Sequence, residues 1–500
     1  MSYFSTRGNE CVTASQAILS GMASDGGLYV PSMFPLISMD EIEGMISKSY
    51  EERAVRVLSA YLEDYPTREV VDSVYAAYGN GHFNDPKIAP LRRLDDGTQV
   101  LELFHGPTLA FKDMALQLLP QLLTRAARMN GEDREIAILV ATSGDTGKAA
   151  LEGFRNVPGT SCTVFYPLDG VSEVQQLQMT TTDGNNTHVI AVKGNFDDAQ
   201  TGVKTLFASR DFAEDMNARG RVLSSANSIN FGRLVPQIVY YFSAYVDLLA
   251  QGVINPGESV NFVVPTGNFG DILAGYYARN MGLPVNRLIC ASNRNDVLTE
   301  FFASGTYSVH RLFYKTMSPS MDILVSSNLE RLLFESADRD SALVKVWMKQ
   351  LRESGSYSVG DQRREWMESV FYAGCADDGE TAEEIRDVFT QYAYLMDPHT
   401  AVGSRVLRAY REKTGDDKAT VIVSTASPYK FAPDVAAALQ GKSAVKHLDA
   451  FACAQILSSV SGLPIPPQVE RLKDLPVVHH AVCEKDPACM ADAVKAAFCP

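Results

Sequence analysis

The residue of this sequence with the most unusual chemical prospects is a lysine in apolar surroundings. Lys112 follows Leu109-Ala110-Phe111 and lies just before Met114-Ala115-Leu116. Most lysines are solvated charges, and the local sequence alone favours that simpler interpretation. Burial among apolar side chains, however, lowers the pKa of a lysine, and the neutral amine is the form that makes a Schiff base. Lys112 is therefore a candidate for that chemistry.

Two segments rich in glycine and hydroxyl groups lie between a predicted strand and a predicted helix. They are Thr142-Ser143-Gly144-Asp145-Thr146-Gly147-Lys148 and Pro265-Thr266-Gly267-Asn268-Phe269-Gly270-Asp271. Ligands of open α/β sheets bind beyond the carboxyl ends of the strands, and free amides at a helix start attract anions. Each segment is therefore a candidate anion site. The simpler alternatives are a helix N-cap for the first and a tight turn for the second.

The spacing within the first segment does not fit a nucleotide-binding P-loop. That motif requires glycine at position 142 and serine or threonine at position 149, where the chain has Thr142 and Ala149. A nucleotide-dependent kinase is therefore disfavoured. A third segment, Ser424-Thr425-Ala426-Ser427-Pro428, also follows a predicted strand, and alone it is most simply a capped loop.

An alternation of strands and helices begins near Leu101 and would position these loops. Short apolar runs predict strands at 136–141, 161–166, 188–192, 260–264, 287–291 and 420–424. Helical spacing predicts helices at 148–154, 174–180, 199–208 and 271–281. This succession predicts parallel sheets covered by helices on both faces.

The flanking regions have a different pattern. Helical spacing at 42–48 and 52–62 predicts a mostly helical first part, up to about Pro90. Strand patterns fade between about 328 and 397, where amphipathic helices are predicted at 343–351 and 382–394. We interpret that segment as a helical insertion. The end of the chain is proline-rich and then helical, with a last predicted helix at 490–498.

Composition and charge limit the class of protein. Hydrophobic residues make up 46% and charged residues 21%, which is ordinary for a globular protein, and 500 residues favour two or three domains. The formal net charge of −15 argues against a general affinity for nucleic acid, which requires a basic surface. An anionic substrate would therefore require a locally positive site.

Several partners and compartments are not expected. The apolar runs are strand-sized, too short for a membrane span, and the N-terminus lacks the pattern of a secretory signal. The eight cysteines form no C-x-x-C pair and have no zinc-site spacing with histidine, so we expect reduced thiols in a cytoplasmic protein and no metal site.

Longer motifs resemble one enzyme family. Phe-x-Gly-Pro-Thr-x-x-Phe-Lys-Asp at Phe104 to Asp113 is similar to the cofactor-lysine motif of the threonine synthases. Tyr3 to Gly8 and Asp25 to Pro31 resemble the N-terminal signatures of that family. The resemblance extends through nearly the whole chain, in the order that the family has. The length and the N-terminal domain resemble the longer bacterial and fungal branch.

The family belongs to the fold-type II, or tryptophan synthase β-like, group of pyridoxal-phosphate enzymes. The resemblance implies an α/β fold with two parallel-sheet lobes and a mostly helical N-terminal domain. We expect three regions: 1–95 for that domain, 96–455 for the cofactor-dependent core and 456–500 for a C-terminal segment. Within the core, the inner mobile lobe would span about 135–235 and the helical insertion about 328–397.

The resemblance implies a role for each cofactor-binding residue. Lys112 would hold pyridoxal 5′-phosphate as a Schiff base, and Thr425 would hydrogen-bond the pyridine nitrogen. A loop would bind the cofactor phosphate, mainly through backbone amides, and consists of Gly267, Asn268, Phe269, Gly270 and Asp271. Asp145 stands near the cofactor 3-hydroxyl, where relatives often have asparagine. A carboxylate cannot donate as an amide does, so this contact departs from the family pattern.

The resemblance also implies two substrate contacts. Thr142, Ser143 and Thr146 would hold the substrate carboxylate. The segment from Asn227 to Arg233 resembles the substrate-phosphate site, with Asn227, Ser228 and Arg233 as its contacts. A guanidinium clamps phosphate with two hydrogen bonds and supplies the local positive charge that an acidic protein needs. Without the resemblance, a surface ion pair would be the simpler interpretation of Arg233.

The implied reaction is the last step of threonine biosynthesis. O-phospho-L-homoserine and water become L-threonine and phosphate by γ-elimination and β-addition of water, which makes the enzyme a carbon–oxygen lyase acting on phosphates. The nearest alternatives are a serine or threonine dehydratase and a phospholyase that releases phosphate without yielding threonine. A cofactor-free binding protein is a more distant alternative. The sequence does not distinguish a monomer from a dimer.

Overall fold

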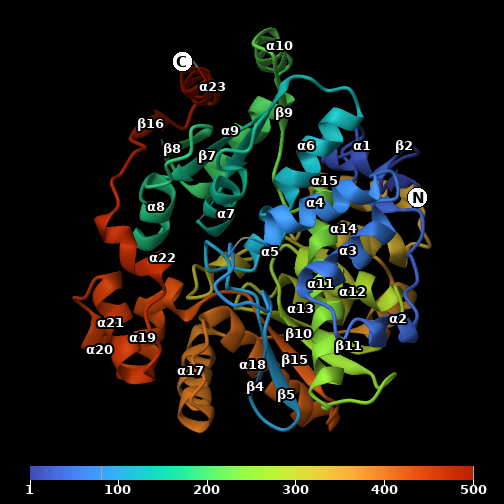
Figure 1. Ribbon diagram of the computed structural model, residues 1–500, viewed down its shortest axis with the longest axis vertical. Coiled ribbons are helices and arrows are strands. Elements are labelled where there is room, and N and C mark those ends of the chain that lie inside the picture. Colours follow the sequence, from blue (N-terminus) through green and yellow to red (C-terminus); the bar gives the residue numbers. More distant parts are fainter. Residues whose placement is uncertain (80, 143, 499–500) are drawn as a thin grey trace.

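Two sheets with helices on both faces form the body of the molecule (Figure 1). The computed structural model describes residues 1–79, 81–142 and 144–498. The larger sheet has the strand order β14-β11-β10-β15-β5-β4, and all its neighbours are parallel except the antiparallel pair β4–β5. Its strands are β4 (Leu91–Arg93), β5 (Thr98–Glu102), β10 (Val260–Pro265), β11 (Val285–Ser292), β14 (Phe371–Cys375) and β15 (Thr420–Ser424).

The smaller sheet is entirely parallel and has the order β16-β8-β7-β6-β9. Its strands are β6 (Glu135–Ala141), β7 (Thr160–Pro167), β8 (Thr187–Lys193), β9 (Arg221–Ser224) and β16 (Ala481–Glu484). We call this sheet with its helices the small lobe. The central strands of both sheets are buried on both faces, as parallel strands under helices are. All the strands predicted from the sequence are present.

Alternate residues of each central strand pack into different cores. In β6, Ile136 and Ile138 pack toward α7 (Asp145–Phe154), whereas Ala137 and Leu139 pack toward α9 (Phe196–Ala208) and the last helix, α23 (Pro487–Ala497). In the larger sheet, α11 (Phe231–Ala250) and α12 (Gly270–Asn280) cover one face, and α18 (Pro398–Thr414) covers the other. The predicted α/β architecture is confirmed.

The N-terminal region is mostly helical, as predicted, but it also contains a small antiparallel sheet. Its helices are α1 (Ala14–Ser20), α2 (Met39–Gly44), α3 (Tyr50–Tyr61) and α4 (Thr67–Tyr78). Its strands are β1 (Tyr3–Ser5), β2 (Cys11–Val12) and β3 (Tyr29–Pro31), in the order β2-β1-β3. These strands are too short to give a periodic signal. A buried ion pair of 2.7 Å between Arg53 and Asp247 joins α3 to α11.

The segment 328–397 is not purely helical, which corrects its interpretation as a helical insertion. It contains α14 (Leu329–Ser336), α15 (Ser341–Ser354), α16 (Asp361–Val370) and α17 (Asp378–Tyr392). It also contains β14, the edge strand that pairs in parallel with β11. The sequence of β14, Phe-Tyr-Ala-Gly-Cys, lacks the aliphatic run that marks a buried strand.

The end of the chain returns to the small lobe. After α19 (Ala432–Gln440) and α21 (Ala450–Ser461), β16 adds a parallel edge strand to the smaller sheet and α23 packs against α9. Both lie beside that sheet at the top of Figure 1. The last helix was predicted, whereas the four-residue strand was not. Among the described residues, no helix is both long and apolar enough to cross a membrane.

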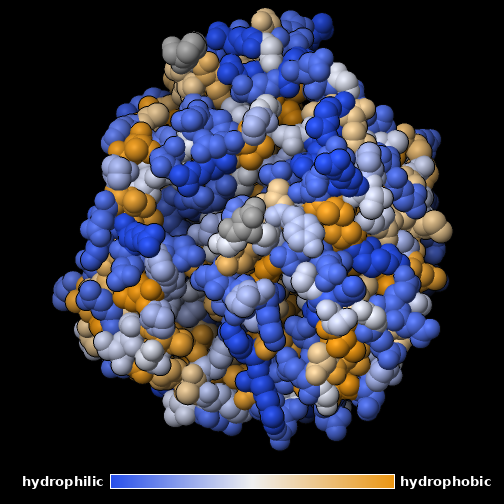
Figure 2. Space-filling view, in the orientation of Figure 1, coloured by the Kyte–Doolittle hydropathy of each residue, from blue (hydrophilic) through white to orange (hydrophobic). Residues whose placement is uncertain are grey.

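The remaining elements are short or connect the layers. They are α5 (Lys112–Leu116), α6 (Leu119–Met129), α8 (Glu173–Thr180), α10 (Arg210–Ala218), α13 (Val297–Ser304), β12 (Thr306–Ser308), β13 (Ser356–Ser358), α20 (Lys442–Val445), α22 (Pro467–Glu470) and the 3₁₀ helices η1 (Pro319–Met321), η2 (Pro428–Phe431) and η3 (Arg471–Asp474). Between the small lobe and the larger sheet, the surface is hollowed and its visible rim is largely hydrophilic (Figure 2).

Candidate active site

Lys112 is the first residue of α5, and its loop is fastened to the segment that follows β15. The backbone N–H of Phe111 donates to the carbonyl of Thr425 at 2.8 Å, and Ala110 forms an isolated antiparallel bridge with Ala426. The structure therefore brings the predicted lysine segment and the third predicted loop together at the carboxyl end of β15.

A carboxylate shapes the loop before Lys112. Asp113 is fully buried and accepts hydrogen bonds from the backbone N–H and the hydroxyl of Thr108, at 2.8 and 2.7 Å. Burial raises the pKa of Asp113 to about 6, although these hydrogen bonds oppose the rise. A Cβ atom at Gly106 would lie only 2.5 Å from a carboxylate oxygen of Asp113. The Gly-Pro-Thr-x-x-Phe-Lys-Asp pattern thus describes a compact turn that presents the lysine.

The Lys112 side chain extends into a mostly buried polar site, with 13% of its surface exposed. Its Nζ donates to Ser320 Oγ at 3.3 Å and lies 3.6 Å from Asp145 Oδ2. Burial lowers the pKa of Lys112, and the nearby cations Lys430 and Arg233 act in the same direction, while Asp145 opposes them. These surroundings favour the neutral amine, which is the form that makes a Schiff base.

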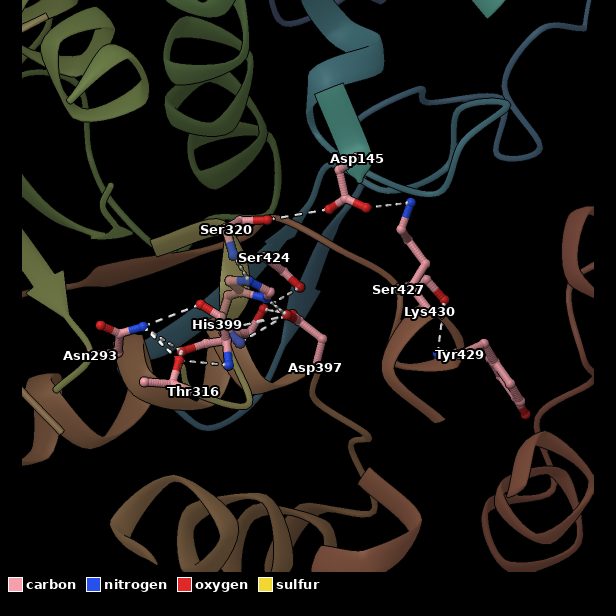
Figure 3. Close-up of polar contacts among 12 residues, drawn as sticks. Asp145, Asn293, Thr316, Ser320, Asp397, His399, Ser424, Ser427, Tyr429 and Lys430 are labelled. Atoms are coloured by element: carbon pink, nitrogen blue, oxygen red, sulfur yellow. Dashed lines mark hydrogen bonds and ion pairs between the residues drawn. The ribbon is translucent and has the colours of Figure 1, made fainter. Parts of the chain in front are cut away.

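Asp145 lies between two lysines at the start of α7, at the carboxyl end of β6. Its Oδ1 atom is 3.0 Å from Lys430 Nζ, and its Oδ2 atom accepts from Ser320 Oγ at 3.3 Å (Figure 3). Oδ1 also accepts from Gln175 Nε2 at 3.1 Å. Burial alone would raise the pKa of Asp145, but Lys430 and Lys112 hold it well below its usual range. Asp145 is therefore a carboxylate, which accepts hydrogen bonds and cannot donate them.

Several residues of this network were not predicted from the sequence. Lys430, in η2, has a side chain with 0% exposure. Ser320, in η1, donates its backbone N–H to His399 Nε2 at 3.1 Å, and His399 Nδ1 lies 2.7 Å from Asp397 Oδ1. The Asp-Pro-His-Thr sequence at Asp397 is a recognisable N-cap, but it does not indicate that His399 faces Ser320.

The loop from Gly267 to Asp271 presents its backbone amides at the start of α12. Phe269 is buried and has the left-handed φ of 61°, a strained conformation that often marks a ligand loop. Among the described residues, no amide N–H between Gly267 and Asp271 has a hydrogen-bond acceptor. A Cβ at Gly267 would lie 2.7 Å from the carbonyl oxygen of Ser320, so this position requires glycine.

The side chain of Asp271 points away from that loop. Its Oδ1 accepts from the hydroxyls of Tyr240 and Tyr241, at 2.6 and 2.8 Å, inside the packing of α11 and α12. Burial raises the pKa of Asp271 to about 6, and the two tyrosine hydrogen bonds oppose this rise. The carboxylate therefore anchors the helix, and only the backbone amide of Asp271 is available to a ligand.

The loop after β6 has a turn built around Thr142. The Thr142 hydroxyl oxygen accepts from the backbone N–H groups of Gly144 and Gly147, at 2.9 and 3.0 Å, and so ties the loop to the first turn of α7. The N-cap position itself is Gly144, which makes no side-chain cap hydrogen bond. Thr146 lies half-buried in the first turn of α7. Ser143, the third predicted contact for the substrate carboxylate, lies outside the described residues.

Arg233 is a buried cation without an acidic partner in the part of the chain that the structure describes. It lies in the first turn of α11 with 3% exposure. Its Nη1 donates to the Ala226 carbonyl at 2.7 Å, and its Nε, also buried, has no hydrogen-bond acceptor among the described residues. Burial lowers the pKa of Arg233 to about 10. A surface ion pair, the simpler interpretation of this residue, is excluded by its burial.

The other two residues predicted at this site lie before α11. Asn227 is exposed and Ser228 is half-buried, and both lie in the turn between β9 and α11. A bridge connects this turn to the Gly267–Asp271 loop: Arg331 donates to the Ile229 carbonyl at 2.6 Å, and to Asn328, whose side chain donates to the Asn268 carbonyl at 3.1 Å. The predicted site for the substrate phosphate and the predicted loop for the cofactor phosphate are therefore adjacent.

Comparison with known families covers nearly the whole chain. Residues 2–78 match the family model described as threonine synthase N terminus, residues 88–426 match the pyridoxal-phosphate dependent enzyme model, and residues 400–494 match the threonine synthase C-terminal model. A threonine synthase of Pseudomonas aeruginosa is 44% identical over 86% of this chain and 89% of that protein. The chain belongs to the threonine synthase family.

Solved structures of this threonine synthase family have the same fold. A pyridoxal-phosphate-bound threonine synthase from Brucella melitensis matches with a TM-score of 0.88 and 39% identity, covering 99% of both chains. A yeast threonine synthase matches with a TM-score of 0.88 and 32% identity, covering 99% of this chain and 98% of that one. Human threonine synthase-like 1 is 38% identical over 94% of this chain, which spans 64% of that longer protein.

The residues present fit pyridoxal phosphate, the cofactor of this family of enzymes. The amides of the Gly267–Asp271 loop have no acceptor in the described part of the chain, and they suit a phosphate because a helix start attracts an anion without basic side chains. Lys112 has the lowered pKa that covalent attachment of the cofactor requires. Thr425 is buried beside the Lys112 loop, where its carbonyl accepts from the backbone N–H of Phe111 at 2.8 Å. The expected cofactor and the expected family are confirmed.

Proposed function

We propose that the chain converts O-phospho-L-homoserine and water to L-threonine and phosphate, with Lys112 as the residue that holds pyridoxal phosphate. The observation that carries this substrate assignment is the buried guanidinium of Arg233, which lacks a carboxylate partner among the described residues and lies close enough to Lys112 to lower its pKa. An unpaired buried cation beside a reactive amine suits an amino acid that bears a phosphate.

Lys112 would act twice, first in holding the cofactor and then in moving protons. Pyridoxal phosphate, when bound, withdraws electrons from the Cα of the amino acid joined to it. When its amine is free, Lys112 would serve as a general base for the Cα proton of the substrate and as a general acid for the return of that proton. Burial lowers the pKa of that amine, which favours its neutral, proton-accepting form.

Arg233 would bind the substrate phosphate and assist its departure. Negative charge builds on the leaving phosphate as its bond to Cγ breaks, and a fixed cation at that position stabilises the transition state. We propose that Asn227 and Ser228 add hydrogen bonds from the same turn. Arg233 is oriented in advance, because Nη1 is held by the Ala226 carbonyl.

The remaining contacts would orient the cofactor and the substrate. The backbone amides of the 267–271 loop would bind the cofactor phosphate, and the Thr425 hydroxyl would meet the pyridine nitrogen without holding it protonated. Thr142, Ser143 and Thr146 would bind the substrate carboxylate; the Thr142 oxygen accepts two amides, which leaves its hydroxyl proton free to donate. Asp145, held as a carboxylate by Lys430, would accept a hydrogen bond near the 3-hydroxyl.

Product analysis tests this function directly. The purified chain, loaded with cofactor, is incubated with O-phospho-L-homoserine, and phosphate and L-threonine are measured together. Lys112→Ala is expected to lose both products and the visible absorption of the bound cofactor. The exposed Lys204, substituted by alanine, is the matched control and should behave as the unmodified chain. Retained activity in Lys112→Ala would overturn the assignment.

The same experiment addresses the nearest alternative. Relatives named threonine synthase-like 1 resemble this chain at 38 to 39% identity, and a phospholyase would release phosphate without L-threonine. Equal amounts of phosphate and L-threonine would exclude that reaction. The division into 1–95, 96–455 and 456–500, a mobile inner lobe at about 135–235 and a cytoplasmic location are parts of the same proposal.

A further inference from the structure

The Ser320 hydroxyl lies between the Lys112 amine and the Asp145 carboxylate and forms a hydrogen bond with each. The role of this hydroxyl depends on the direction of the two hydrogen bonds. Lys112 Nζ donates to Ser320 Oγ at 3.3 Å, and Ser320 Oγ donates to Asp145 Oδ2 at 3.3 Å. We propose that Ser320 is a positioning residue whose hydroxyl aims the lone pair of the Lys112 amine. This inference rests on the proposed role of Lys112, but it does not depend on which substrate the enzyme takes.

The direction of these hydrogen bonds is fixed by Asp145. A carboxylate has no proton to give, so the Ser320 hydroxyl must donate toward Asp145 and turn an oxygen lone pair toward Lys112. The ion pair with Lys430 at 3.0 Å keeps Asp145 in that state. The Ser320 oxygen can therefore only accept from the lysine.

This arrangement has a consequence for the neutral amine. A neutral lysine has two N–H bonds and one lone pair. Ser320 Oγ, at 3.3 Å, accepts one N–H, and Asp145 Oδ2, at 3.6 Å, attracts the other. The lone pair of Lys112 then points away from both oxygens. That orientation matters because the lone pair is the part of the amine that attacks a carbonyl carbon or takes a proton. A small misorientation of a reacting group lowers the reaction rate by a large factor.

The backbone of Ser320 is held in position by a buried histidine–aspartate pair, His399 and Asp397. Its backbone N–H donates to His399 Nε2 at 3.1 Å, so that nitrogen carries no proton and Nδ1 carries it toward Asp397 Oδ1 at 2.7 Å. Asp397 is fully buried and is fixed in turn by the backbone N–H of His399 at 2.9 Å. The carbonyl of Ser320 lies against Gly267, where only glycine leaves space for it.

Asp397, His399 and Ser320 resemble a hydrolytic triad in composition but not in geometry. In such a triad the histidine takes the proton of the serine hydroxyl. Here His399 Nε2 accepts the backbone N–H of Ser320, and the Ser320 hydroxyl faces Asp145 (Figure 3). The same hydroxyl accepts from Lys112 Nζ. Ser320 is therefore not activated as a nucleophile. The His399–Asp397 pair fixes the position of the Ser320 backbone, and Asp145 fixes the direction of its hydroxyl.

The test measures how fast Lys112 captures the cofactor, independently of any turnover. The full-length chain is stripped of cofactor and mixed with saturating pyridoxal phosphate between pH 6 and 10. The first-order rate is followed by visible absorbance, and borohydride reduction with peptide mass analysis identifies Lys112 as the site. At high pH the amine is neutral in every variant, so the plateau rate reports orientation and not protonation.

We expect Ser320→Ala to lower the plateau rate about tenfold. Ser320→Thr, which keeps the hydroxyl, should stay within about threefold of the unmodified chain. The matched control is Ser318→Ala. Ser318 is buried in the same loop, and its hydroxyl accepts from Asn293 Nδ2 at 3.1 Å. In the part of the chain that the structure describes it forms no hydrogen bond with Lys112, so its removal should leave the plateau unchanged.

The histidine gives a second, independent variant. His399→Gln retains an acceptor for the Ser320 N–H and should keep most of the plateau rate, whereas His399→Phe removes that acceptor and should reproduce the Ser320→Ala loss in part.

An unchanged plateau in Ser320→Ala, or a profile displaced along the pH axis with the same plateau, overturns the positioning role. An equal loss in Ser318→Ala overturns it too, because the effect would then belong to the loop. None of these outcomes depends on whether O-phospho-L-homoserine is the substrate.

Discussion

Asp145 and Lys430 form a buried ion pair, with 3.0 Å between Oδ1 and Nζ, that joins the two sheets of the molecule. Asp145 follows β6 of the smaller sheet, and Lys430 lies in η2, after β15 of the larger one. Lys430 also donates to the Thr108 carbonyl at 2.8 Å and approaches Gln178 Oε1 at 3.4 Å. The same pair that sets the charge of the site is therefore a contact between the small lobe and the larger sheet.

Removing one partner of this pair should be more harmful than removing both. Lys430→Met leaves the Asp145 carboxylate buried beside Lys112 alone, and we expect it to lower the free energy of unfolding by about 3–5 kcal/mol. The double variant Asp145→Asn/Lys430→Met should lose less than Lys430→Met alone, and therefore less than the sum of the two single variants. Urea unfolding of the cofactor-free chain at pH 7 measures all four proteins. Additive losses would show that the two side chains do not interact.

Arg233 should strengthen the binding of an anion and lower the stability of the protein when no anion is bound. A buried cation without a carboxylate partner among the described residues is costly, so Arg233→Met should raise the free energy of unfolding by about 1–3 kcal/mol when no anion is present. In the cofactor-loaded protein, the same change should weaken binding of inorganic phosphate about 10- to 100-fold. Unfolding curves and phosphate titration measure the two effects.

The matched control for Arg233 is Arg331→Met. Arg331 is equally buried, but its guanidinium is satisfied by the Tyr29 and Ile229 carbonyls at 2.9 and 2.6 Å, and by Asn328. Its removal should destabilise the protein, because those acceptors lose their donor. If Arg233→Met also destabilises the protein and leaves phosphate affinity unchanged, Arg233 is a structural residue and does not bind the substrate phosphate.

The sheets could be predicted from the sequence because their central strands are apolar on both faces. Runs such as Val260–Pro265 are bounded by glycine-rich loops, and the helices that follow have regular spacing. The edge strands could not be predicted in this way. β14 and β16 are short, and most of their residues are exposed or only half-buried. They become strands because β11 and β8 offer unpaired backbone groups.

Some residues of the site could be predicted from the sequence, and others could not. Lys112 and Arg233 were identified because long motifs surround them, and each is a charged residue that the fold buries. Lys430 and Ser320 lie in short 3₁₀ helices far along the chain from Lys112, and nothing in their local sequences indicates which groups they meet. Their roles depend on how two sheets are packed together, which local patterns do not specify.

Gly106 should be indispensable to the loop that presents Lys112. An added Cβ would lie 2.5 Å from Asp113 Oδ2 and 2.6 Å from Asp113 Cβ, so Gly106→Ala must displace the buried carboxylate. We expect a loss of about 2 kcal/mol or more in the free energy of unfolding, with lower cofactor occupancy. Gly44→Ala is the control, because a Cβ there meets nothing within 4 Å. Similar stability of the two variants would contradict this account of the motif.

Because of Asp271, the stability of the protein should fall as the pH rises from about 4 to about 6. Its pKa is raised from 3.8 to about 6 by burial, so the folded chain binds a proton more tightly than the unfolded chain does. Stability from such a group is present at low pH and is lost as the pH rises through the folded pKa. A shift of this size corresponds to roughly 3 kcal/mol. Asp271→Asn lacks the titrating group but keeps an oxygen to accept from Tyr240 and Tyr241.

The measurable quantity is the difference in unfolding free energy between Asp271→Asn and the unmodified, cofactor-free chain. That difference should move in favour of the asparagine variant by roughly 3 kcal/mol between pH 4 and pH 7, whatever its absolute value, since other titrating groups are common to both proteins. Asp113 has the same raised pKa in both, and its contribution cancels. A difference that does not change with pH would mean that Asp271 titrates normally, and that the two tyrosine hydrogen bonds offset its burial completely.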